Sequence, residues 1–117
     1  MCGREASVAS VLFVRIASDL EPEEFDRRLL ERRPRFREVP GLVQKIYGRE
    51  PVSGDVCGIY FFESDDALAA FRGSELAQTI PTAYEATDVR REAYEVLYAL
   101  WPERGPFAEH PAAAASP

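Results

Sequence analysis

The chain has 117 residues, of which 46% are hydrophobic and 29% are charged, and its formal net charge is −6. This length and composition are typical of one globular domain, and no apolar run reaches the roughly 18 residues that a membrane-spanning helix needs. The acidic balance argues against a nucleic-acid binder, because such proteins need a basic surface to displace counterions.

The first half of the chain predicts a strand, a helix and a hairpin. Residues 8–17 are rich in β-branched and aromatic side chains, which is typical of a strand covered on both faces. Residues 22–38 show the apolar spacing of a helix. Residues 42–49 and 56–63 predict two more strands, joined by a glycine-containing turn at 51–55.

The predicted helix carries many arginines: Arg27, Arg28, Arg32, Arg33, Arg35 and Arg37. Such a cluster is able to form an anion site. Acidic residues interleave with the arginines between Glu21 and Glu38, however, and several pairs have the favourable i,i+4 order. This pattern favours a solvated helix face held by salt bridges.

The second half predicts helical turns and a final strand. Ser64 is a suitable N-cap for a helix that ends at Gly73, and residues 74–80 predict one or two further turns ended by Pro81. Residues 88–100 predict a long strand, although their content of Arg, Glu, Ala and Leu also fits a helix.

The order of these elements, βαββαβ, predicts a ferredoxin-like α+β fold with a four-stranded antiparallel sheet. The folded domain is expected at 8–101, with a flexible tail at 1–7 and a flexible, dispensable Pro/Ala-rich tail at 102–117. Both alternating sets of the first and third strands are largely apolar. The sheet face away from the helices would therefore be a large apolar patch, which predicts a homodimer.

A metal centre is not expected. The only histidine, His110, lies in the predicted tail, and the two cysteines, Cys2 and Cys57, are expected to be reduced thiols. The N-terminus lacks the apolar region of a signal peptide, so a cytoplasmic location without membrane contact is expected.

Two sequence blocks carry a family resemblance. They are residues 40–47 (Pro-Gly-Leu-Val-Gln-Lys-Ile-Tyr) and residues 58–64 (Gly-Ile-Tyr-Phe-Phe-Glu-Ser). Over roughly residues 8–100 the chain resembles the antibiotic biosynthesis monooxygenase-type domains of the dimeric α+β barrel superfamily. The resemblance implies two protomers joined sheet to sheet, with a pocket between each sheet and its helices.

The resemblance also implies a function. It suggests a small monooxygenase that needs no cofactor and acts on an aromatic or polyketide-like substrate. A polyketide cyclase or isomerase, and a non-catalytic small-ligand-binding or accessory protein, remain open alternatives with the same fold. The haem-degrading branch of the superfamily uses His and Asn in its pocket, and this chain has no Asn.

An oxygenase of this kind must deprotonate a phenol or enol, stabilise the resulting anion and exclude water. Arg15 or Lys45 is a candidate to hold the anion, and Tyr47 or Tyr60 is a candidate to relay the proton. Tyr60 and Arg15 are therefore the predicted catalytic residues.

The predicted substrate-binding residues are Lys45, Tyr47, Phe62 and Tyr84. The structural alternative is that Tyr60 and Phe62 are ordinary core aromatics, that Lys45 extends to the surface and that Arg15 pairs with an acid. The sequence does not tell which alternating set of a strand faces the helices.

Overall fold

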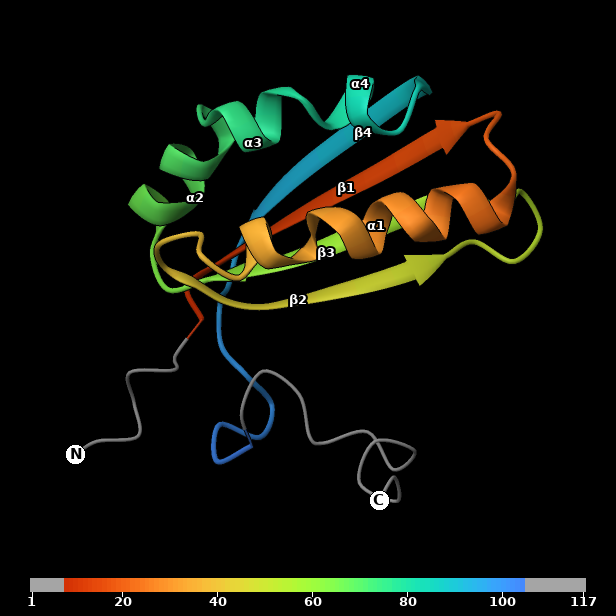
Figure 1. The fold of residues 1–117 in the computed structure, drawn as a ribbon. Helices are drawn as coiled ribbons and strands as arrows, with labels where there is room; N and C mark the ends of the chain where they lie inside the picture. The colour runs from red at the N-terminus through yellow and green to blue at the C-terminus, as the bar shows by residue number, and fades with distance from the viewer. Residues whose placement is uncertain (1–7, 105–117) are drawn as a thin grey trace, which may run out of the picture.

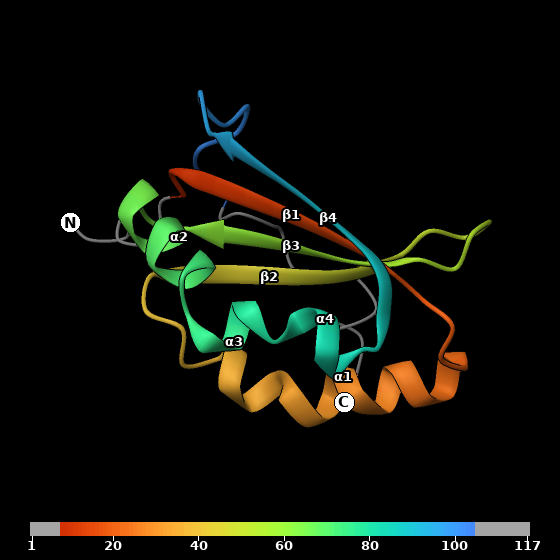
Figure 2. The same cartoon turned by 90° about the horizontal axis from the view of Figure 1, so that it is seen from above.

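The computed structural model describes residues 8–104 as a four-stranded antiparallel sheet with all helices on one face (Figure 1; Figure 2, seen from above). The elements are β1 (Ser10–Ser18), α1 (Pro22–Phe36), β2 (Leu42–Arg49), β3 (Val56–Phe62), α2 (Asp65–Arg72), α3 (Glu75–Gln78), α4 (Ile80–Ala83) and β4 (Ala86–Glu95). Their order in the sheet is β2-β3-β1-β4, which confirms the ferredoxin-like prediction. Residues 1–7 and 105–117, with Cys2, His110 and most of the predicted C-terminal tail, lie outside the described residues.

The two faces of the sheet differ in what covers them. On the helix side, β1 contributes Leu12, Val14 and Ile16, and β3 contributes Gly58, Tyr60 and Phe62, all of them buried. The residues between them, which include Phe13, Arg15, Ile59 and Phe61, are only partly buried. Alternation along both strands places these four on the face opposite the helices. The structure therefore shows which alternating set of each strand faces the helices, a question that the sequence left open.

A β-bulge orients the side chains of β2. The pairing of β2 with β3 shifts register between Leu42 and Gln44. After this shift Lys45 lies opposite Tyr60, so Lys45 and Tyr47 point to the helix side together with Leu42. Without the extra residue, the alternation from Leu42 would have turned Lys45 to the other face.

The helices begin where the sequence predicts. Pro22 lies in the first turn of α1, where its missing N–H costs no helical hydrogen bond. The hydroxyl of Ser64 accepts a hydrogen bond from the N–H of Ala67 at 3.0 Å and caps α2. Helix α1 ends at Phe36 rather than at residue 38. Residues 37 and 38 form a turn, and Pro40 disfavours a helical conformation in the residue before it.

The short helices differ from the prediction in one detail. Pro81 does not end a helical segment; it lies inside α4, in the first turn. The N–H groups of a first turn have no intrahelical partner, so a proline is tolerated there. Within the described part of the chain, no helix combines the length and the apolar character needed to cross a membrane.

The last element is a strand, but the predicted range of 88–100 was wrong. Strand β4 runs over Ala86–Glu95 and pairs with β1 up to Ser10, where β1 itself begins. One further bond joins the N–H of Val96 to the carbonyl of Ala9, at 2.9 Å. Among the described residues, β1 offers no further partner beyond that point, and the pairing ends there. Large apolar side chains then follow on the surface: Leu97, Tyr98, Leu100 and Trp101.

Gly41 joins α1 to β2 at a point of very close approach. Its φ is +78°, and a Cβ atom at this position would lie 2.5 Å from the Cβ of Ala67. Its carbonyl accepts the N–H of Glu63 at 2.9 Å. The loop before β2 is thus fixed against the start of α2, and only glycine fits.

We expect Gly41→Ala to lower the free energy of unfolding by about 2–4 kcal/mol, because it adds steric overlap to backbone strain. The matched control is Gly54→Ala, since Gly54 has a similar φ of +82° but open space around its Cα. This control should cost only about 1–2 kcal/mol. Urea unfolding measures both values, and equal losses would contradict the close packing of the loop on α2.

Candidate active site

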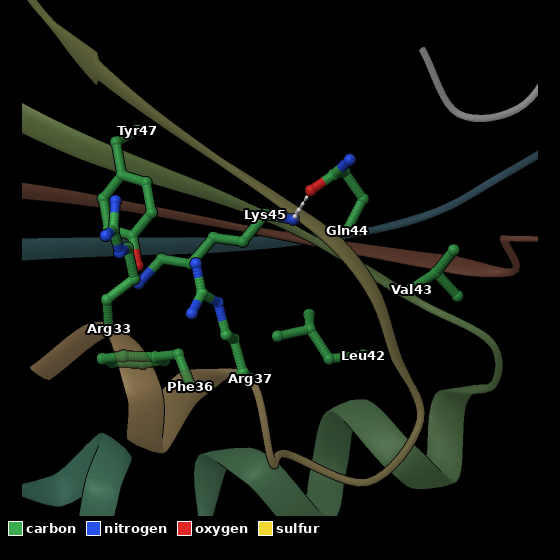
Figure 3. A pocket seen from close by; sticks show the side chains of 8 residues that line it. All are labelled: Arg33, Phe36, Arg37, Leu42, Val43, Gln44, Lys45 and Tyr47. Carbon is green, nitrogen blue, oxygen red and sulfur yellow. Dashed lines mark hydrogen bonds between the residues drawn. The ribbon is translucent and has the colours of Figure 1, made fainter. Parts of the chain in front are cut away.

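A pocket opens between the C-terminal half of α1 and strand β2 (Figure 3). Its volume is about 330 Å³, and its walls are formed by Arg33, Phe36, Arg37, Leu42, Val43, Gln44, Lys45 and Tyr47. An adjoining hollow of about 360 Å³ shares Arg33 and Tyr47 with it. Both volumes fall in the range of small-molecule sites.

A small void of about 10 Å³ lies deeper in the domain. Phe36, Lys45 and Tyr47 line both the void and the pocket, and the void is also lined by Tyr60 and Tyr84. This space is about enough for one water molecule. Lys45 and its two aromatic neighbours therefore form the wall between the outer pocket and the tyrosines of the core.

The Lys45 amine lies in an aromatic cage. Its Nζ atom is 3.4 Å from the ring centroid of Phe36, 4.3 Å from that of Tyr47 and 4.4 Å from that of Tyr60. Gly58 provides the room, because a Cβ atom at this position would lie 3.1 Å from the Cε of Lys45. The side chain therefore lies across β3 instead of extending to the surface.

Burial lowers the pKa of Lys45 from its ordinary value to about 7, and the nearby charge of Arg32 lowers it further in the same direction. Within residues 8–104 no carboxylate pairs with Lys45 to restore its charge. An amine with this pKa is partly neutral near pH 7 and is able to accept a proton from a substrate.

Arg32 fixes a positive charge beside the cage. Its guanidinium lies 5.7 Å from the ring centroid of Tyr84 and 5.8 Å from that of Phe36. One nitrogen donates to the carbonyl of Leu76 at 3.0 Å, whereas the buried Nε has no hydrogen-bond partner among the described residues. Arg32 is thus held in place by the carbonyl of Leu76, and its positive charge disfavours a second positive charge on Lys45.

The three tyrosines near the cage are neutral donors at ordinary pH. Burial raises the pKa of Tyr60 strongly, and it also raises those of Tyr47 and Tyr84. Tyr60 lies behind Lys45 with 2% of its surface exposed. Tyr84 stacks on Phe25 with 4.8 Å between ring centroids. Of these tyrosines, Tyr47 is the one that lines the outer pocket.

The structure thus brings together four of the six predicted site residues: Lys45, Tyr47, Tyr60 and Tyr84. The other two lie elsewhere. Arg15 is on the opposite face of the sheet, where its Nε pairs with Asp55 at 2.9 Å. Phe62 is fully buried and packs against Phe71 in the core, outside the pocket walls.

Arg33 and Arg37 are pocket residues that the sequence analysis did not select. The predicted salt bridges of α1 are confirmed for Arg27, Arg28 and Arg35, which pair with acids. Arg32 makes no ion pair among residues 8–104 and donates to the carbonyl of Leu76 instead. Among the described residues, no carboxylate lines this pocket. Among residues 8–104, no group of three His, Cys, Asp or Glu side chains is arranged to hold a metal ion.

A family of known proteins matches most of the chain. Residues 11–101 match the family described as "Putative mono-oxygenase ydhR". The chain belongs to this family. A search of curated protein sequences returned no significant match. The family assignment confirms the resemblance inferred from the two sequence blocks around β2 and β3.

Several solved structures have the same fold as this member of the ydhR family. SnoaB, a cofactor-independent oxygenase from Streptomyces nogalater, aligns with a TM-score of 0.66 at 17% identity, over 80% of this chain and 98% of SnoaB. A putative antibiotic biosynthesis monooxygenase from Deinococcus radiodurans gives 0.66 at 12% identity, over 78% and 95% of the two chains. One from Caulobacter crescentus gives 0.60 at 17%, over 78% and 92%. At these identities the likeness establishes only that the chain shares the ferredoxin-like α+β fold of these proteins.

Proposed function

We propose that this protein is a small, cofactor-independent monooxygenase that acts on an aromatic or polyketide-like substrate in the pocket between α1 and β2. Membership of a mono-oxygenase family supports the reaction class. The observation that carries the proposal is the Lys45 amine, whose pKa of about 7 suits it to take a proton at the wall of this pocket.

The reaction requires an electron-rich substrate. Lys45 removes a proton from a phenol or enol, and the resulting anion reacts with O₂ directly. One oxygen atom enters the substrate and the other leaves as water with two hydrogens lost by the substrate, so no external reductant is needed. The protonated Lys45 then offsets the negative charge of the anion at short range.

The tyrosines have different roles in this scheme. Tyr47 lines the pocket and is positioned to donate its hydroxyl proton to a bound oxygen atom. Tyr60 forms the floor of the cage and acts through Lys45, as a positioning residue. Arg15 lies on the other face of the sheet and has no role in this pocket.

The test is oxygen uptake with polycyclic phenols as trial substrates. Lys45→Met should lower kcat by about 10²-fold or more, because it removes the base. Lys45→Arg is the informative control, since arginine keeps the positive charge but stays protonated. We expect Lys45→Arg to be equally inactive. Activity retained in this variant would mean that position 45 only holds the anion.

The pH profile follows from the same pKa. The base is the neutral amine, so wild-type kcat/KM should rise as pH increases through about 7 and then level off. Ligand binding without oxygen uptake would favour a binding protein, and substrate rearrangement without oxygen uptake would favour a cyclase or isomerase.

We also propose that two chains pair through the uncovered sheet faces. The apolar side chains on this face include Val11, Phe13, Ile59 and Phe61, and all are only partly buried within one chain. Leu97 and Tyr98, which follow β4, are 86% and 82% exposed. Apolar surface of this extent is typical of an interface.

Sedimentation should therefore give twice the chain mass of 13.1 kDa at micromolar concentration. Phe13→Glu places a charge in the centre of this face and should produce monomers. Val52→Glu is the matched control, because Val52 is 92% exposed in the turn before β3 and should tolerate the charge. A wild-type monomer would contradict the pairing.

A further inference from the structure

We propose that Arg33 and Arg37 form an anion-binding subsite at the mouth of the pocket, and that the substrate carries a carboxylate that binds there. The inference rests on the proposed function, because it assigns a property of the substrate to the same pocket. The substrate would then be bound at both of its ends. Its carboxylate would contact the two arginines, and its reacting phenol or enol would contact Lys45.

The first observation is that both guanidinium groups are uncommitted. Within residues 8–104 neither Arg33 nor Arg37 makes an ion pair or a side-chain hydrogen bond, whereas their neighbour Arg35 pairs with Glu75 at 2.7 Å. Arg33 and Arg37 are one helical turn apart, so their side chains leave α1 on the same side. Figure 3 shows both reaching from α1 toward β2, beside Lys45 and Tyr47.

The second observation is the charge of the pocket. The whole chain has a net charge of −6, yet the pocket walls contain Arg33, Arg37 and Lys45 without any acid. The arginine charges reach the pocket interior, because they oppose the effect of burial on the pKa of Tyr47. A local positive site raises the concentration of anions near it, even in a protein whose net charge is negative.

A purely structural role would explain the same arginines differently. Both lie near the C-terminal end of α1, where positive charges stabilise a helix. Under that reading, their removal would lower stability but leave ligand binding unchanged. Binding of a matched pair of ligands separates the two explanations.

The probes are 3-hydroxy-2-naphthoate and 2-naphthol, which share the rings and the hydroxyl and differ by the carboxylate. Calorimetry on the full chain should show tighter binding of the naphthoate. Arg33→Gln and Arg37→Gln should each weaken its binding by about 10-fold, because each removes a charge-assisted hydrogen bond, and should leave 2-naphthol unaffected. Arg35→Gln is the control on the same helix and should change neither affinity.

The inference is overturned if the two ligands bind equally, if the preference for the naphthoate survives in both variants, or if neither ligand binds. Oxygen uptake is measured separately with the same naphthoate. An arginine-dependent preference without oxygen uptake supports the subsite and counts against the oxygenase, so the two proposals fail independently.

Discussion

The Lys45 amine, enclosed by three aromatic rings, is the interaction around which this side of the domain is arranged. An unpaired charge moved out of water costs several kcal/mol, whereas a cation–π contact returns only about 0.5–2 kcal/mol. The balance shifts the amine toward its neutral form, in agreement with a pKa lowered to about 7. Lys45 is also the only lysine in the chain, so the basic chemistry of an amine side chain is confined to this position.

Several separate elements keep the amine in this state. The bulge in β2 turns Lys45 toward the helices, Gly58 of β3 leaves room for its side chain, and Phe36 of α1 covers it. Arg32 adds a like charge from α1. These elements are distant in sequence, and the ferredoxin-like topology makes them neighbours. The sheet thereby has one face that meets the helices and the pocket, and an opposite face with partly buried apolar side chains.

The fold was largely predictable because its signals are local. Proline, serine and glycine mark the element ends, and short runs rich in β-branched and aromatic residues mark β1 and β3. The end of β4 was not predictable, because it depends on where β1 begins. Residues 97–100 continue a strand-like pattern, but among the described residues no strand lies beside them to pair with.

The candidate site was predictable only in part. Period-two spacing predicts that Lys45 and Tyr47 share a face of β2. Tyr60 joins them because of the register between β2 and β3, which includes the bulge between Leu42 and Gln44 and was not predicted. The same spacing cannot tell which face meets the helices, which is why Arg15 was selected although it points away. Arg33 and Arg37 were missed because their availability depends on acids in other elements. Glu75 of α3 and Glu85 before β4 pair with the neighbouring arginines, and within residues 8–104 no acid pairs with Arg33 or Arg37.

The most direct test of this account is the protonation of Lys45 itself. Since the chain has a single lysine, protein labelled with ¹³C-lysine should give one side-chain Cε signal, which can be followed by NMR as the pH is varied. The account predicts a titration midpoint near 7 in the folded protein and a return to the ordinary value of 10.5 on unfolding. A midpoint near 10.5 in the folded protein would show that the amine stays charged, and it would contradict the role of Lys45 as a base.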